Sequence, residues 1–95
     1  MDHGLALFAM IEQVLAGATD VAAFGERFYW YYFDEVPEGA LSGAEQEFIE
    51  GVCEQLDLTA ATPDAESRRF GWIDQGEFLV WLRARYADFM RREAS

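Results

Sequence analysis

The residues of this chain that could do chemistry are mostly carboxylates, and they gather in one region. Between Arg27 and Arg68 stand ten acidic side chains and no lysine or arginine. They are Asp34, Glu35, Glu38, Glu45, Glu47, Glu50, Glu54, Asp57, Asp64 and Glu66. Carboxylates can transfer protons, ligate calcium or attract a cation. Because uncompensated charges of one sign repel each other on a small protein, the pattern favours attraction of a basic partner.

Catalysis and metal binding find little support in the other residues. The single histidine, His3, stands where we expect a frayed terminus, and the single cysteine, Cys53, falls on an apolar helix face. Asp34 and Glu35 are adjacent, but no nucleophile and base can be paired. The sequence also has neither the spacing of a calcium-binding loop nor a glycine-rich phosphate loop. We therefore expect no enzyme activity, no metal and no cofactor.

The overall charge narrows the class of partner. Eighteen acidic residues against seven arginines and no lysine give a net charge of −11, which argues against direct binding of nucleic acid or an anionic membrane. Six of the arginines follow Ser67. The 52% of hydrophobic and 16% of aromatic residues supply a core, so we expect a single folded domain over residues 1–95.

The compartment is also suggested by composition. A lone cysteine cannot form an internal disulfide, which is typical of a reducing compartment. No basic leader precedes the first apolar segment, and no stretch approaches the roughly 18 apolar residues of a membrane span. We expect a soluble, cytoplasmic protein.

Helix start and stop signals along the chain predict an all-α fold. We expect a single-domain four-helix bundle with helices at about 5–16, 20–35, 43–56 and 75–91. Gly17 can adopt the left-handed conformation after the first helix, with Leu5, Phe8, Ile11 and Leu15 on one side of that helix. Thr19 is expected to cap the second helix and Pro37 to end it. Two capping boxes, Ser42 with Glu45 and Asp74 with Glu77, predict the starts of the third and fourth helices.

The connection from Asp57 to Ile73 is long for a helical bundle. Pro63 could begin an extra helical turn within it, and Phe70 and Trp72 are expected to pack on the core. The pair Arg68 and Arg69 could bind a phosphate group, but we expect it to neutralise the nearby Asp64 and Glu66. 

A helical wheel divides the third helix into two faces. One arc holds Phe48, Ile49, Val52, Cys53 and Leu56, and the opposite arc holds Glu47, Glu50, Glu54 and Asp57. Such a charge run is commonly a solvated face. No basic residue stands four positions away to form intrahelical pairs, however, so the stripe is also suited to an external cation.

Six consecutive aromatic residues, 28–33, cannot all face one core. The wheel places Phe28 and Tyr32 with the core, Tyr29 and Phe33 on the flank, and Trp30 on the opposite side. Either the helix is sandwiched and buries most of these rings, or an aromatic patch is exposed. In the second case Trp30 is the expected anchor of a protein interface.

A series of short motifs suggests a family. Leu15-Ala16-Gly17 ends the first helix, Ala18-Thr19-Asp20 leads to Phe24, Glu26 and Arg27, and after the acidic middle Asp64-Ala65-Glu66-Ser67-Arg68 precedes Trp72-Ile73-Asp74. Over roughly residues 8–89 this pattern resembles the colicin D-like immunity proteins. The resemblance implies a small acidic helical bundle in the cytoplasm of a toxin-producing bacterium. Such a protein binds the C-terminal nuclease domain of a cognate tRNA-cleaving toxin and blocks its active site. The aromatic run departs from the family pattern, so no individual contact is transferred.

The charge pattern and the resemblance predict one function. We expect an immunity protein that covers the active-site cleft of a basic, tRNase-type toxin nuclease domain with an acidic surface. The expected partner-binding residues are Trp30, Asp34, Glu35, Glu38, Glu47, Glu50, Glu54 and Asp57. One alternative is a non-enzymatic adaptor that forms a homodimer through the aromatic patch. Another is a mimic of DNA directed at a nucleoid or restriction protein, which needs the same negative surface.

Overall fold

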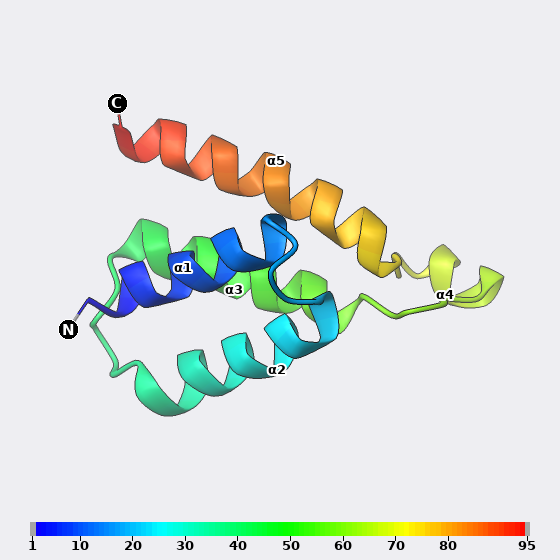
Figure 1. Cartoon of the computed structure of the whole chain (residues 1–95), viewed down its shortest axis with the longest axis horizontal. Helices are drawn as coiled ribbons and strands as arrows, with labels where there is room; N and C mark the ends of the chain where they lie inside the picture. The colour runs from blue at the N-terminus through cyan, green and yellow to red at the C-terminus, as the bar shows by residue number, and fades with distance from the viewer. Residues whose placement is uncertain (1, 95) are drawn as a thin grey trace. The chain divides into compact units, whose positions relative to one another are not determined.

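The computed structural model describes residues 2–94 and is built of helices (Figure 1). The elements are α1 His3–Leu15, α2 Val21–Trp30, the π-helix η1 Tyr31–Glu35, α3 Gly43–Asp57, α4 Ala65–Arg69 and α5 Gln75–Ala94. Within the described residues, β pairing is limited to one isolated parallel bridge, Thr59 with Ile73. The all-α class predicted from the sequence is therefore confirmed.

The chain divides into two compact units, Met1–Cys53 and Glu54–Ser95, and the division falls within α3. This division does not test the sequence expectation of one domain over residues 1–95, which stays a prediction. Each unit is described below by itself.

Helix α1 begins and ends as local sequence dictates. The carboxylate of Asp2 accepts a hydrogen bond from the backbone N–H of Leu5, and Gly17 adopts a φ of +80° after the last turn. The N–H of Ala18 then bonds the carbonyl of Gln13, which completes a Schellman motif. The buried side chains are Leu7, Phe8, Ile11 and Val14. Leu5, expected on the same side as Phe8, is 65% exposed, so the buried face is rotated from the predicted one.

Helix α2 differs from the prediction at both ends. Asp20, not Thr19, is the cap, because its carboxylate accepts from the N–H of Ala23 at 2.7 Å. The predicted range of 20–35 holds as a helical range, but its last five residues are π-helical. The N–H of Val36 closes this segment by bonding the carbonyl of Tyr31, five residues back.

Three helices of the first unit contact one another. The rings of Phe8 on α1 and Phe48 on α3 lie 6.3 Å apart, and the hydroxyl of Tyr29 on α2 donates to the carbonyl of Cys53 on α3. The capping box of α3 is present as predicted, with Ser42 and Glu45 bonding each other's backbone N–H. Phe24, Phe28, Ile49 and Val52 are almost fully buried. Because these contacts join all three helices, they fix how α2 and η1 face α3.

The second unit contains the long connection and α5. Its connection is closed at the base, where Ala60 N–H bonds the carbonyl of Ile73 and Ile73 N–H bonds the carbonyl of Leu58. The extra turn exists as α4, but its cap is Asp64, so Pro63 precedes the helix instead of starting it. Phe70 is 73% exposed and does not pack on a core, contrary to the expectation, whereas Trp72 is half-buried.

The start of α5 has the predicted capping box. Asp74 and Glu77 bond each other's backbone N–H at 2.7 and 3.1 Å. The guanidinium of Arg68 joins the same two carboxylates, 2.7 Å from Glu77 and 3.4 Å from Asp74. Arg68 therefore pairs with the start of α5 and not with Asp64 and Glu66, because α4 is followed by a reversal of the chain at Gly71 that directs its last turn toward α5.

Candidate functional site

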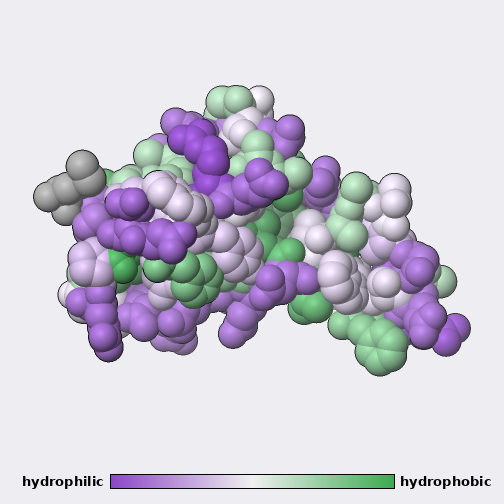
Figure 2. Space-filling model, turned by 90° about the horizontal axis from the view of Figure 1, so that it is seen from below, coloured by the Kyte–Doolittle hydropathy of each residue, from purple (hydrophilic) through white to green (hydrophobic). Residues whose placement is uncertain are grey.

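The π-helix sorts the six aromatic residues into different environments. Phe28 is buried, Tyr29, Tyr31 and Tyr32 are half-buried, and Trp30 and Phe33 are 58% and 65% exposed. On the side of the molecule along which α2 lies, apolar surface is set among strongly hydrophilic side chains (Figure 2). Two of the six rings are therefore exposed. The sequence nominated Trp30 and missed Phe33.

Three rings of this region form what we call the aromatic cluster, consisting of Tyr29, Tyr32 and Phe33. Phe33 stacks on Tyr29 with ring centroids 5.7 Å apart and an interplanar angle of 14°. It meets Tyr32 edge-on at 5.0 Å and 62°. Both tyrosines are tied to α3, since Tyr29 donates to the carbonyl of Cys53 and Tyr32 donates to Oε1 of Glu50 at 3.3 Å. The cluster is thus held by two helices.

Tyr31 makes a separate contact with the first helix. Its hydroxyl lies 2.9 Å from Nδ1 of His3, and the two rings are 5.8 Å apart. His3 is the first residue of α1 and is half-buried, so the expectation of a frayed histidine is wrong. The contact joins α1 to η1.

The predicted acidic residues are all exposed. Asp34 and Glu35 end η1, Glu38 follows in the turn, and Glu47 and Glu50 lie on α3. Glu54 and Asp57 are exposed as well, but they belong to the last turns of α3 in the second unit. Five of the predicted carboxylates lie in the first unit, and we call these the acidic surface: Asp34, Glu35, Glu38, Glu47 and Glu50.

The acidic surface has no internal counter-charge. No side chain described between residues 2 and 94 forms an ion pair with any of its five carboxylates. The first unit has ten acidic residues and a single arginine, Arg27, whereas the second has eight acidic residues and six arginines. The charge asymmetry seen along the sequence therefore coincides with the division of the chain. The negative field belongs chiefly to the unit that bears Trp30 and Phe33.

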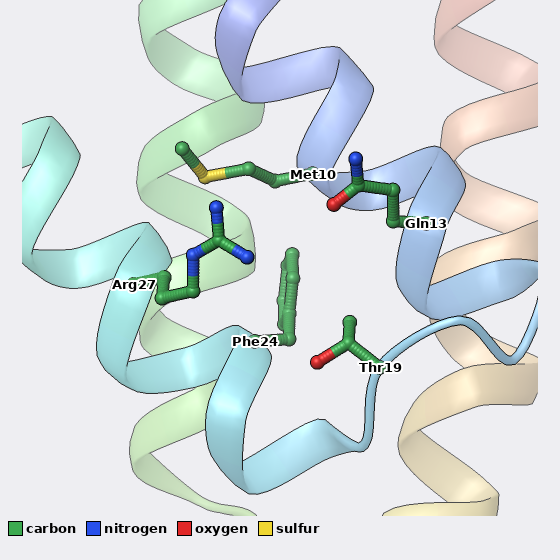
Figure 3. Close-up of a pocket in the computed structure, with 5 residues that line it drawn as sticks. All are labelled: Met10, Gln13, Thr19, Phe24 and Arg27. Atoms are coloured by element: carbon green, nitrogen blue, oxygen red, sulfur yellow. The ribbon is translucent and has the colours of Figure 1, made fainter.

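Arg27 lines a small depression in the first unit. Figure 3 shows Met10 and Gln13 projecting from α1, Phe24 and Arg27 from α2, and Thr19 from the connection between them. The depression encloses about 10 Å³, room for one water molecule at most. Ligand pockets usually measure about 300 Å³ or more. This depression is therefore too small to hold a substrate.

Residues 2–94 also bear on metal binding and membrane insertion. No group of three His, Cys, Asp or Glu side chains there lies close enough to hold a metal ion. None of the described helices combines the length and apolarity that crossing a bilayer requires. Cys53 is buried on the apolar face of α3, as the helical wheel predicted.

Comparison with known proteins gives no family. No protein-family model matches this chain, and neither a curated protein nor a solved structure is significantly similar to it. Function is therefore argued from the acidic surface and the exposed rings themselves.

Proposed function

We propose that this chain is an immunity protein, similar to the colicin D-like family, that binds and neutralises a basic nuclease toxin domain of the tRNA-cleaving type. The observation that supports this proposal is the acidic surface, whose five exposed carboxylates have no ion-pair partner among residues 2–94. The same unit also bears the exposed rings of Trp30 and Phe33.

The chemistry of inhibition follows from what a nuclease needs. A cleft that binds nucleic acid is lined with Lys and Arg, so carboxylates can occupy the positions of phosphates. Opposite charge accelerates encounter, and desolvated aromatic side chains slow dissociation and separate one toxin from another. Glu54 and Asp57, exposed in the last turns of α3, are also proposed as contact residues, as the sequence predicted.

The proposal brings with it the remaining expectations from the sequence. The protein is not an enzyme and uses no cofactor, it acts in the cytoplasm, and it does not bind nucleic acid or a membrane. The single-domain four-helix bundle expected from the sequence stays a prediction. Identification of the partner tests the statements on activity, compartment and binding.

The experiment begins with capture of partners from the native cytoplasm at low and moderate salt. A basic nuclease domain recovered at moderate salt is then purified, and its cleavage of tRNA is measured with increasing amounts of this protein. Stoichiometric inhibition is the expected result. Recovery of a nucleoid or restriction protein instead would replace immunity by DNA mimicry, and inhibition without binding at the acidic surface would overturn the proposed contact.

Variants separate the roles of charge and rings. Asp34→Asn combined with Glu47→Gln should slow association and flatten its salt dependence, because these carboxylates act at long range. Trp30→Ala should accelerate dissociation, by about tenfold if Trp30 is a hot spot. Glu66→Gln on α4 is the matched control and should leave both rates unchanged.

A second candidate function is a structural adaptor that forms a homodimer. It is favoured by the simultaneous exposure of Trp30 and Phe33, since large exposed rings also drive self-association. The mass of the purified chain at micromolar concentration distinguishes the two. A stable dimer that Trp30→Ala converts to monomer would support the adaptor and oppose immunity.

A further inference from the structure

The aromatic cluster combines an exposed ring with a hydrogen bond to a carboxylate. Phe33 is 65% exposed although it contacts both Tyr29 and Tyr32. Tyr32 in turn reaches the carboxylate of Glu50, and Asp34 follows Phe33 directly in the chain. The open ring of Phe33 therefore belongs to a cluster that reaches a carboxylate on a different helix.

One oxygen of Glu50 remains available to an external donor. Tyr32 at 3.3 Å and Gln46 at 3.2 Å both donate to Oε1 of Glu50. Among residues 2–94, none donates to Oε2. Because Tyr32 and Gln46 both hold Oε1, Glu50 is pre-positioned and loses little side-chain freedom when it accepts another hydrogen bond.

The combination of ring and carboxylate discriminates between the two basic side chains. A guanidinium is planar and weakly hydrated, so it can stack on an aromatic face while its N–H groups bond a carboxylate. A lysine ammonium is a compact, strongly hydrated charge that gains less from the ring. Carboxylates alone would attract arginine and lysine equally, because both carry one positive charge. A ring next to a carboxylate favours arginine.

We infer that the aromatic cluster and Glu50 bind an arginine side chain of the partner, in preference to lysine. This inference rests on the proposed function and names the chemistry of one contact at the same surface. A cationic protein is the expected occupant because the first unit has ten acidic residues against one arginine. A second copy of the chain also has arginines, but its net charge of −11 opposes close approach.

The test uses the full chain and two synthetic peptides, hexa-arginine and hexa-lysine, at equal ionic strength. NMR titration follows the ring resonances of Phe33 and Tyr32. Hexa-arginine should bind about two- to fivefold tighter than hexa-lysine, the range expected for an exposed cation–π contact, and should shift both rings. Equal affinities, or shifts absent from Phe33, would overturn the inference.

Two leucine variants provide a matched comparison. Phe33→Leu keeps an apolar side chain without a π face, so it should abolish the preference for hexa-arginine and leave hexa-lysine binding unchanged. Phe70→Leu removes the ring of another exposed phenylalanine, 73% exposed on the second unit, and should keep the preference. A preference that survives Phe33→Leu contradicts the inference.

The outcome is separable from that of the proposed function. If no nuclease is inhibited but the arginine preference depends on Phe33, immunity fails and the arginine site stands. If a nuclease is neutralised with unchanged affinity by Phe33→Leu, immunity stands and the arginine site fails.

Discussion

The hydroxyl of Tyr32 donates a hydrogen bond to Oε1 of Glu50, 3.3 Å away. Partial burial raises the pKa of the Tyr32 phenol above 10.0, and the negative charge of Glu50 and this hydrogen bond raise it further. The protonated phenol is therefore favoured in the folded state. Its contribution to stability is present below a pH of about 10 and is lost as the pH rises through the raised pKa.

Glu50→Gln should lower the pKa of Tyr32 towards 10.0, since it removes the charge while leaving an acceptor oxygen. Tyrosinate formation at Tyr32, followed by NMR, measures the change. Glu47→Gln, on the same exposed face of α3, is the control and should leave the titration in place. Superimposable Tyr32 titration curves for the wild type and Glu50→Gln would contradict the proximity of the Tyr32 hydroxyl to the Glu50 carboxylate.

The cap of α5 should make stability sensitive to acid. The backbone N–H of Glu77 holds the pKa of Asp74 below 3.8, with smaller contributions from the side-chain bond of Glu77 and from Arg68. A depressed pKa contributes stability above the unfolded value, and that contribution is lost as the pH falls through the folded pKa. In the wild type, NMR titration should give the Asp74 carboxyl a pKa below that of an aspartate in an unstructured peptide.

Removing this cap should lower thermal stability. Asp74→Ala should reduce the Tm by a few degrees, roughly 5 °C, whereas Asp74→Asn should retain most of the effect because the amide oxygen still accepts. Arg68→Ala is expected to matter less, since its ion pairs are exposed. Equal losses for Asp74→Ala and Asp74→Asn would show that charge, not capping, is responsible.

Two glycines should respond to alanine with opposite signs. Gly17 has a φ of +80°, where a Cβ is strained, so Gly17→Ala should destabilise the protein by about 1 kcal/mol. Gly51 lies inside α3 with nothing within 4 Å of an added Cβ, so Gly51→Ala should stabilise by about 0.5–1 kcal/mol. Urea unfolding measures both changes in the free energy of unfolding. Changes of the same sign would contradict the left-handed conformation of Gly17 or the helical one of Gly51.

The bond from Tyr29 to the carbonyl of Cys53 should contribute measurably to the first unit. Tyr29→Phe removes the hydroxyl and keeps the ring that stacks on Phe33, so it should cost about 1 kcal/mol. Tyr31→Phe, whose hydroxyl contacts His3 near the start of α1, is the comparison and should cost less. An unchanged unfolding midpoint for Tyr29→Phe would mean that water replaces this bond without loss.

The features that the sequence predicted correctly depend on residues close in the chain. Each capping box joins residues three positions apart, and the left-handed Gly17 is set by its own lack of a Cβ. The cap of α2 was placed one residue early, because Thr19 and Asp20 are both good caps and only the backbone conformation selects Asp20.

The candidate site was harder to predict because it depends on a change of helix type. A wheel of 100° per residue does not describe Tyr31–Glu35, where bonds run between residues five apart, so it could not identify Phe33 as an exposed ring. The exposure of Phe70 was missed for another reason, since phenylalanine is usually buried. The exposure of the acidic residues of α3 follows from an ordinary α-helical period and was predicted.

The pairing of Thr59 with Ile73 affects which changes of chain length the fold can tolerate. Because the backbone is bonded at both sides of residues 61–72, this segment leaves and returns at one place. Doubling the length of such a loop costs only about 0.6 kcal/mol. Insertions at the exposed Ala61 and Thr62, before α4, should therefore cost little free energy, and a fluorescent or affinity module grafted there would leave the beginning of α5 in register.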